Sequence, residues 1–357
     1  MKKKILITFG TRPELLKLFN VIKILKRDKE IDLKVLNTSQ HSDLLKTHLK
    51  SLPIKIDYFN KIKSFKDIST NSIYISKYID KIIKSFNPNL IIYQGDTLTT
   101  FLSSFYANLN SIKTMHIEAG LRTFDRKNPW PEESFRNAIT EFTDYHCAPT
   151  EIAKKNLISD NVKLKDIRLT GNTIVDILND TIKNKNLRKN IYNLKKPFIY
   201  VTIHRRENIG QKLEFFCDKL KILSKFYKNF NFYIPVHSNP NISKDIFSRL
   251  KNIDNIKLIK PLSYMSNLCY IANSLFVISD SGGIQEEVAS LKKKILIYRK
   301  LTERPEILKY HGILIDENNF LKEFKKLVKN PYPKNNKNPF GDGKASIKIY
   351  KFIKNVI

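Results

Sequence analysis

The sequence has few cysteines, and those it has show no paired spacing. Three occur in 357 residues, at Cys147, Cys217 and Cys269. Their number is odd, they are far apart, and each lies among apolar residues. We therefore expect buried thiols in a reducing compartment, without a disulfide or a metal role. The histidines likewise show no paired metal-ligand spacing, so no metal site is expected.

Long hydrophobic runs are also missing. No run of about eighteen apolar residues occurs, which argues against a helix that spans a membrane. The basic start at Lys2–Lys4 resembles the head of a signal peptide, but the apolar run after it stops at Gly10, too early for such a peptide. The sequence therefore predicts a cytoplasmic protein without membrane insertion.

The glycine signatures of common cofactors are absent as well. No Gly-x-Gly-x-x-Gly follows a strand candidate, which argues against bound NAD. No Gly-x-x-x-x-Gly-Lys-Ser/Thr occurs, so the chain is not a P-loop NTPase. We expect no cofactor, and catalysis would have to come from side chains alone.

Negative charge is in short supply. Lysine and arginine number 64 against 34 acidic residues, for a formal net charge of +30. Such a charge suggests a nucleic-acid-binding module. However, the basic residues are mostly lysine and evenly spread, without an arginine-rich run, an RNA-binding aromatic pair or a zinc-finger spacing. We expect no nucleic-acid partner, although a positive surface would attract an anionic substrate.

Short apolar strand candidates alternate with helical periods along the whole chain. This alternation predicts an α/β protein with parallel sheets covered on both faces, and the length suggests two domains. We place these at residues 1–171 and 172–340, with a last helix at 344–357 that packs back on the first. The expected strands are Ile5–Phe9, Asp32–Asn37, Leu90–Tyr93, Ile112–Ile117, Tyr145–Ala148, Ile167–Thr170, Phe198–Ile203, Phe232–Val236, Ile256–Ile259, Leu275–Ile278 and Lys294–Tyr298.

Polar clusters follow six of these strands, after Phe9, Tyr93, Ile117, Ile203, Val236 and Ile278. In parallel sheets, ligands bind at the carboxyl ends of the strands. The richest cluster runs from His116 to Arg136 and combines acids, arginines, a histidine and the only tryptophan. A solvated loop with a few salt bridges is the simpler interpretation, but it does not explain why the clusters share one end.

Ser281-Gly282-Gly283 follows a strand and opens a helix, which is a suitable seat for a diphosphate. Glu287, one turn further, could accept from ribose hydroxyls or could be an ordinary surface acid. His204 and His237 follow strands and lie beside cations or polar residues, so we favour functional roles for both.

Seven motifs together resemble the bacterial non-hydrolysing UDP-N-acetylglucosamine 2-epimerases, and the resemblance covers nearly the whole chain. The motifs are Gly10-Thr11-Arg12-Pro13-Glu14, Gln94-Gly95-Asp96-Thr97, His116-Ile117-Glu118-Ala119-Gly120-Leu121-Arg122-Thr123, Pro129-Trp130-Pro131-Glu132-Glu133, His204-Arg205-Arg206-Glu207-Asn208, Ser281-Gly282-Gly283-Ile284-Gln285-Glu286-Glu287 and Thr302-Glu303-Arg304-Pro305-Glu306.

This resemblance implies a GT-B-like architecture, two Rossmann-like domains facing across a cleft, with the second domain binding UDP. It also implies a homodimer that interconverts UDP-GlcNAc and UDP-ManNAc. By position, the catalytic residues would be Asp96, Glu118, Glu132 and His204. The substrate-binding residues would be Arg12, Lys17, Arg136, His237, Ser281, Gly282, Gly283 and Glu287. We favour Asp96 and Glu132 for proton transfer, with Glu118 in support.

Some positions depart from the family pattern. Ser39 and Ser42 flank Gln40 and His41, where the family usually has glycine and arginine. In many members of the family this region joins a second, regulatory UDP-GlcNAc site, and Asp43 stands where some of them have glutamine. Gln40 and His41 remain, and they are the candidate allosteric residues. Asn267 replaces a residue that often packs on the uracil. The alternatives are a hydrolysing epimerase that releases ManNAc and UDP, and a GT-B UDP-sugar glycosyltransferase.

Overall fold

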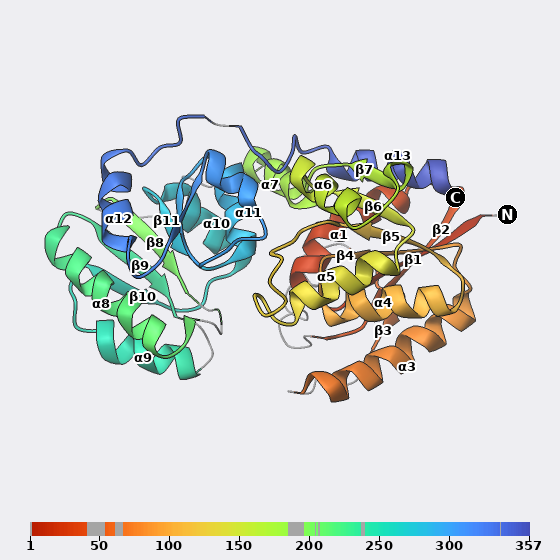
Figure 1. Cartoon of the computed structure of the whole chain (residues 1–357), viewed down its shortest axis with the longest axis horizontal. Helices are drawn as coiled ribbons and strands as arrows, with labels where there is room; N and C mark the ends of the chain where they lie inside the picture. Colours follow the sequence, from red (N-terminus) through yellow and green to blue (C-terminus); the bar gives the residue numbers. More distant parts are fainter. Residues whose placement is uncertain are drawn as a thin grey trace. The chain divides into compact units, whose positions relative to one another are not determined.

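The chain folds into two compact α/β units (Figure 1). The structure is a computed structural model that describes residues 2–40, 54–60, 67–184, 196–203, 205, 208–236, 240–335 and 337–357. Unit 1 comprises Met1–Ile177 and Phe340–Ile357, and unit 2 comprises Leu178–Pro339. The chain therefore passes between the units twice, and its last segment belongs to unit 1.

Unit 1 is built on a sheet of seven strands in the order β3-β2-β1-β4-β5-β6-β7, and every neighbouring pair is parallel. The central strands β1 and β4 are apolar runs buried on both faces, as expected where helices cover a parallel sheet. The strands are β1 (Lys3–Phe9), β2 (Ile31–Asn37), β3 (Tyr58–Phe59), β4 (Leu90–Gln94), β5 (Lys113–Ile117), β6 (Tyr145–Ala148) and β7 (Ile167–Leu169).

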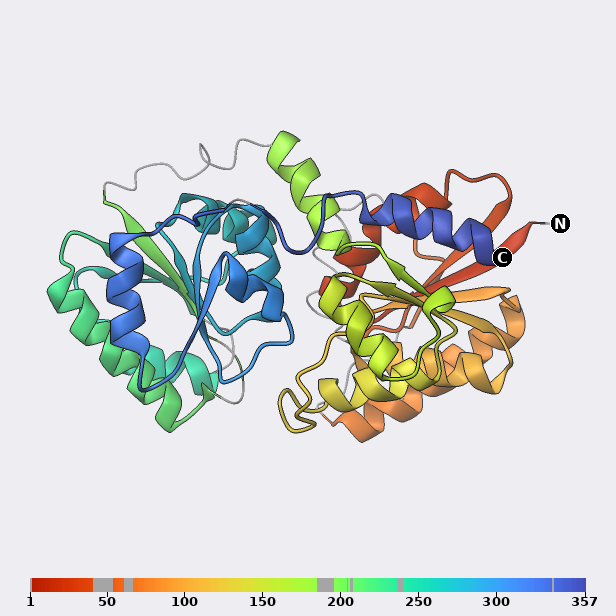
Figure 2. The same cartoon turned by 45° about the horizontal axis from the view of Figure 1, so that its top comes forward.

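Helices cover both faces of this sheet. Ile5 and Ile7 point to one face and pack with α1 (Arg12–Leu25) and with the C-terminal helix α13 (Ala345–Val356), which lies alongside α1 (Figure 2). Leu6 points to the other face and belongs to an apolar cluster with residues of three further helices. The remaining helices of this half of the chain are α3 (Ile68–Phe86), α4 (Leu98–Leu109), α5 (Glu132–Glu141), α6 (Glu151–Ser159), the 3₁₀ turn Leu164–Asp166 and α7 (Thr173–Asn184).

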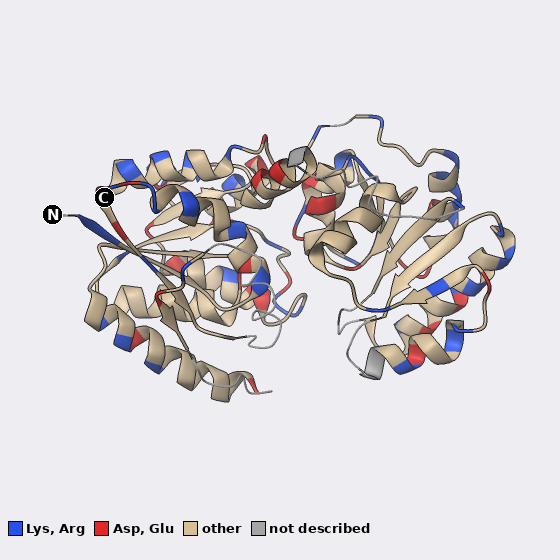
Figure 3. Ribbon diagram, turned by 180° about the vertical axis from the view of Figure 1, so that it is seen from behind, with Lys and Arg blue, Asp and Glu red and all other residues tan. Residues whose placement is uncertain are grey.

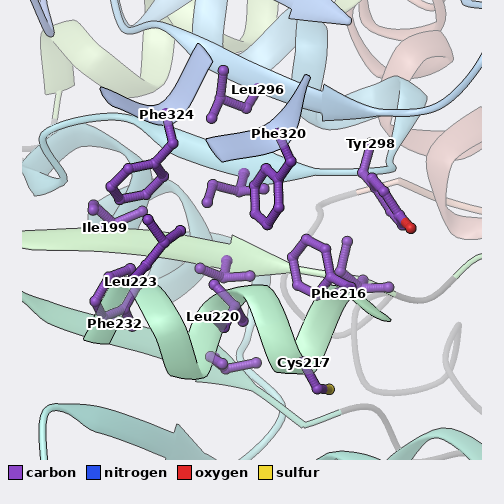
Figure 4. Close-up of a cluster of buried hydrophobic side chains, with 14 of the residues drawn as sticks. Ile199, Phe216, Cys217, Leu220, Leu223, Phe232, Leu296, Tyr298, Phe320 and Phe324 are labelled. Carbon is purple, nitrogen blue, oxygen red and sulfur yellow. The ribbon is translucent and has the colours of Figure 1, made fainter. Parts of the chain in front are cut away.

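Unit 2 repeats the plan with six parallel strands in the order β10-β9-β8-β11-β12-β13. Its largest apolar cluster joins α8 and α12 to the strands between them, through Phe216, Phe320 and Phe324 (Figure 4). The elements are β8 (Phe198–Thr202), α8 (Gln211–Phe226), β9 (Asn231–Pro235), α9 (Pro240–Leu250), β10 (Ile256–Ile259), α10 (Tyr264–Asn273), β11 (Val277–Ser279), α11 (Gly282–Ser290), β12 (Ile295–Tyr298), the 3₁₀ helix Pro305–Lys309, β13 (Gly312–Ile315) and α12 (Phe320–Lys329).

The strand orders fix where a ligand can bind. In unit 1 the chain direction across the sheet reverses between β1 and β4, and in unit 2 it reverses between β8 and β11. Doubly wound sheets bind their ligands at such switch points, beyond the carboxyl ends of the strands. The turns that begin at Gly10 and Gly95 lie at this point in unit 1. The turns at Arg205 and Asp280 lie at it in unit 2.

The α/β class and the two parallel sheets are confirmed, with differences in detail. Strand β11 is Val277–Ser279 and so begins later than the expected Leu275. Strands β3 and β13 were not predicted. β3 has two residues and β13 is a four-residue run that opens on Gly312, so neither gives a sequence pattern long enough to recognise. The helix expected after His41 falls outside the described residues.

Lysine and arginine residues occur on elements of both units (Figure 3). The spread matches the even distribution of basic residues along the sequence. Across the described ranges, no helix combines the length and the hydropathy that a membrane span requires.

Candidate active site

A buried carboxylate joins the turn after β1 to the turn after β4 in unit 1. Glu14 accepts hydrogen bonds from the backbone N–H groups of Gly10 (3.0 Å) and Thr11 (2.7 Å), and from the hydroxyls of Thr97 (2.7 Å) and Thr100 (3.1 Å). Burial raises the pKa of Glu14 above its ordinary value, while these hydrogen bonds lower it. The turn before Arg12 is thereby tied to the turn that contains Asp96.

Close packing holds the same turn against its neighbours. A Cβ at Gly10 would lie 2.1 Å from the Thr99 hydroxyl oxygen and 2.5 Å from that of Thr38, so no larger residue fits. Gln40 lies beside it and accepts from the backbone and hydroxyl of Thr99, at 3.0 and 2.9 Å. Gln40 is therefore a neighbour of the first turn, whereas His41 lies outside the described residues.

Glu118 lies just beyond β5 and carries three donors on its carboxylate. Lys17, one turn into α1, donates to Oε1 at 2.5 Å, and Asn172 donates to the same oxygen at 2.6 Å. Gln94, the last residue of β4, donates to Oε2. Glu118 also adopts a left-handed backbone conformation with φ of 66°. Such a conformation is uncommon for a residue other than glycine and often marks a functional position.

Asp96 lies one strand away, beyond β4, and is held by an arginine. Arg136 donates to Asp96 Oδ2 from Nε at 2.8 Å and contacts it from Nη2 at 2.6 Å. Its Nη1 donates to Glu133 at 2.6 Å. Glu133 is fully buried and accepts from the backbone N–H groups of Thr123 and Phe124. Glu132, the first residue of α5, is half-buried next to this network.

His116 is a structural histidine of this site. It is buried in β5, and its Nε2 donates to the carbonyl of Gly95 at 2.7 Å, which supports the turn that carries Asp96. Burial lowers the pKa of His116 to about 4. The ring is therefore neutral at physiological pH and does not serve as a general acid there.

A prediction for stability follows from this buried ring. The unfolded chain protonates His116 near its ordinary pKa of 6.5, whereas the folded protein resists until about pH 4. The free energy of unfolding should therefore fall by about 3 kcal/mol from this residue as the pH drops from 6.5 to 4. We expect His116→Gln, whose amide can still donate to Gly95, to lose that part of the pH dependence. Urea unfolding across this pH range measures it, and an unchanged slope in the variant would contradict the assignment.

In unit 2, the N-terminus of α11 packs on a buried network of charges. Arg304 donates to Glu286 at 2.6 Å and also contacts Glu303, which in turn accepts from Arg299 at 2.7 Å. A Cβ added to Gly282 would lie 2.6 Å from Glu303 Oε1 and 2.7 Å from Arg304 Nη1, whereas one at Gly283 would meet no atom within 4 Å. The start of α11 is therefore packed tightly against Glu303 and Arg304 at Gly282, whereas the space next to Gly283 is open.

These two glycines form a matched pair for a second prediction. Gly282→Ala should destabilise the protein by about 1–3 kcal/mol, because the buried ion network must move to admit the methyl group. Gly283→Ala, one residue further into the same helix, should be neutral or stabilise by about 0.5 kcal/mol. Equilibrium unfolding in denaturant compares them, and equal stability of the two variants would show that the network does not restrict Gly282.

Glu287 is buried and has a defined partner. Asn267 donates to Glu287 Oε2 at 3.1 Å and accepts from the hydroxyl of Tyr200 at 2.6 Å. The residue that departs from the family pattern thus supports the predicted ribose-binding acid. Asp280, before the helix, accepts from the backbone N–H of Arg205 and from the side chain of Asn208, both at 2.9 Å.

The structure thus brings several of the predicted residues together and leaves others untested. Lys17 contacts Glu118, and Arg136 contacts Asp96. His204 and His237 lie outside the described residues. Four supporting residues were not identified from the sequence as site residues. They are Glu14, Gln94, Glu133 and Asn172. The first three belong to the quoted motifs, and Asn172 was assigned to the domain boundary.

A polar hollow of about 420 Å³ lies at the amino-terminal ends of β6 and β7 in unit 1. Its lining includes Glu141, Asp144 and Asp160. Among the residues described, no group of three or more histidine, cysteine or acidic side chains could hold a metal ion. The hollow is separate from the turns described above.

Comparison with known proteins gives a consistent result. A family model described as UDP-N-acetylglucosamine 2-epimerase matches residues 23–354. The chain is 40% identical to the UDP-N-acetylglucosamine 2-epimerase of Salmonella borreze over 98% of its own length and 97% of that protein. It is 38% identical to the enzyme of that name from Campylobacter jejuni, over 99% and 98%.

Solved structures agree with this. The UDP-GlcNAc 2-epimerase of Neisseria meningitidis, in a crystal structure bound to UDP-GlcNAc, superimposes with a TM-score of 0.91 at 34% identity and covers 99% of this chain and 100% of its own. A lipopolysaccharide outer core galactosyltransferase, at 13% identity and a TM-score of 0.60, shares the fold alone. The fold is GT-B-like, as expected, and the chain belongs to the UDP-N-acetylglucosamine 2-epimerase family.

Proposed function

We propose that this protein interconverts UDP-N-acetylglucosamine and UDP-N-acetylmannosamine by inverting carbon 2 of the sugar, without net hydrolysis. The observation that carries the proposal is a pair of acid–cation contacts at adjacent strand ends, Glu118 with Lys17 and Asp96 with Arg136. Membership of the family supplies the substrate class. The elements Arg12-Pro13-Glu14 and Pro131-Glu132-Glu133 resemble the non-hydrolysing branch of that family.

The chemistry explains why carboxylates and cations occur together. The hydrogen on carbon 2 is a poor acid, because no carbonyl group flanks that carbon. A base removes it while the bond between carbon 1 and the UDP oxygen breaks, so that the electron pair forms a double bond between carbons 1 and 2. In the return step the UDP oxygen adds to carbon 1, and an acid delivers a proton to the opposite face of carbon 2.

Two faces require two proton-transfer groups. We assign these to Asp96 and Glu132, which belong to the turn beyond β4 and the first turn of α5. General acid–base catalysis of this kind contributes about 10²–10⁴-fold in rate. Glu118, whose carboxylate already has three donors, is assigned to support. Arg136 joins the two segments because it starts on α5 and binds Asp96.

The departing diphosphate carries negative charge and needs preorganised donors. Two features of the chain fit this need. Arg12 is the first residue of α1, and Ser281, Gly282 and Gly283 form the start of α11, where backbone N–H groups are available to an anion. We assign the second feature to the UDP moiety, with Glu287 for its ribose. His204 and His237 are retained as proposed contacts on the resemblance alone.

Incubation with UDP-GlcNAc in deuterated water tests the proposal. We expect deuterium at carbon 2 of recovered UDP-GlcNAc and accumulation of intact UDP-ManNAc, followed by NMR and mass spectrometry. Free ManNAc with UDP would instead identify a hydrolysing epimerase. Absence of exchange, together with release of UDP and transfer of the sugar when an acceptor is added, would favour a glycosyltransferase.

A further inference from the structure

Asn172 lies where the chain passes between the two units. It follows Gly171, whose φ of 88° turns the chain out of the sheet after β7, and it precedes α7. Its backbone N–H donates to the carbonyl of Phe340 at 2.7 Å, and Phe340 begins the returning segment of unit 1. Both passages of the chain are thus joined by a hydrogen bond at this residue.

The side chain of Asn172 points back into unit 1 and both of its polar atoms are used. Nδ2 donates to Glu118 Oε1 at 2.6 Å, and Oδ1 accepts from the backbone N–H of Ile174 at 3.1 Å. The residue is 3% exposed. The contact with Ile174 fixes the direction of the amide, because it requires oxygen at that position and therefore presents nitrogen to Glu118.

This amide shares one carboxylate oxygen with a charged group. Lys17 also binds Oε1, at 2.5 Å, while Gln94 binds Oε2. A lysine side chain is long and rotatable and supplies charge more than direction. An amide whose other end is fixed supplies direction. Together they define the orientation of a carboxylate that stands on a strained, left-handed backbone.

We propose that Asn172 is a positioning residue for the epimerisation, which holds the Glu118 carboxylate in its working orientation from the point where the chain passes between the units. The inference rests on the proposed function. It adds Asn172, which lies near the point where the chain leaves unit 1, to the residues at the strand ends that are assigned above.

Asn172→Asp is the sharpest test, because it keeps the shape of the side chain, the acceptor for Ile174 and the backbone contact with Phe340. It replaces the donor to Glu118 by a like charge. We expect kcat for exchange at carbon 2 to fall about 10²-fold or more at pH 8, with a change of KM of less than about threefold. Part of the loss should reverse toward pH 6, where the two acids can share a proton.

Asn255→Asp is the matched control. Asn255 lies in unit 2, where its Nδ2 donates to the carbonyls of Ser224, Tyr227 and Phe230. The same substitution there also removes donors and adds a charge, so it should lower stability while kcat of the folded enzyme stays within about twofold. A loss of kcat in this control as large as that in Asn172→Asp would overturn the proposal.

A second readout does not depend on catalysis. In Asn172→Asp, repulsion from Glu118 raises the pKa of the acid pair in the folded state, so stability should decline from pH 5 to pH 8 relative to the wild type. Lys17 contacts Glu118 and His116 interacts with it electrostatically, and both of these titratable groups remain in every variant. Glu118→Gln in the Asn172→Asp background should remove this decline.

These readouts separate two failures. A wild-type protein that shows no exchange refutes the proposed function, and the pH dependence of unfolding then still decides whether Asn172 and Glu118 act as a pair. Exchange by the wild type together with near-normal kcat in Asn172→Asp refutes the positioning role. The same holds if the pH dependence of unfolding is unaltered by Asn172→Asp.

Discussion

Asp96→Asn is expected to reduce deuterium incorporation at carbon 2 by about a thousandfold, while UDP still binds. The substitution keeps the size of the side chain and an oxygen that can accept from Arg136, but it removes the group assigned to proton transfer. Arg136 remains anchored by Glu133, so the turn should keep its structure. Single-turnover exchange in deuterated water and calorimetric titration with UDP measure the two halves of the prediction.

Asp144→Asn provides the control for this variant. Asp144 directly precedes β6, at the amino-terminal ends of the strands of the same sheet. It accepts hydrogen bonds from the backbone N–H and the hydroxyl of Thr114, both at 2.8 Å. Its replacement should leave exchange within about twofold of the wild type after correction for folded protein. Exchange above a tenth of the wild-type rate in Asp96→Asn would remove Asp96 from the proposed mechanism.

Lys17→Met is expected to have the second largest effect, on stability and rate together. The two side chains of this pair are 9% and 5% exposed, so removing the lysine takes a cation from a buried carboxylate that Gln94 and Asn172 also contact. Breaking a buried ion pair in this way costs about 3–5 kcal/mol. We also expect a loss of exchange of about a hundredfold or more, because Glu118 loses its contact with the Lys17 ammonium group.

The double variant Lys17→Met with Glu118→Gln separates these effects. A neutral glutamine needs no cation, so most of the lost stability should return, whereas exchange should stay low. Denaturant unfolding of the two single variants and the double variant gives the coupling free energy between the residues. A coupling near zero would show that the contact contributes little in solution.

The sequence predicted well which polar residues lie at the strand ends. It did not predict which distant residues contact them. The polar clusters that contain Asp96 and Glu118 were located because each follows a recognisable apolar strand, and the family resemblance then identified the two acids. The parallel pairing of β4 and β5 places both at the carboxyl ends of these strands. The partner of Glu118 from α1 is 101 residues away in the chain and its partner Asn172 is 54 residues away. Spacing along a sequence carries no information on such contacts, because they depend on how the helices pack on the sheet.

Glu14 illustrates the same limit, because only some of its contacts are local in the sequence. The bonds from Gly10 and Thr11 to Glu14 are those expected of an acid in the first turn of a helix, and they are local in the sequence. Its bonds to Thr97 and Thr100 come from a different strand–helix turn. Burial, more than residue type, therefore decides which acids of a motif support the structure and which face a substrate.

The position of α13 has a consequence for how the protein is made. This helix contributes Ile349, Phe352 and Ile353 to the core beneath α1, and its first turn is capped by Asp176, which accepts from Ala345 and Ser346. A ribosome therefore releases the whole continuous segment of unit 2 before the residues that complete unit 1 have been synthesised. The half of the protein that is translated first is the half that finishes folding last.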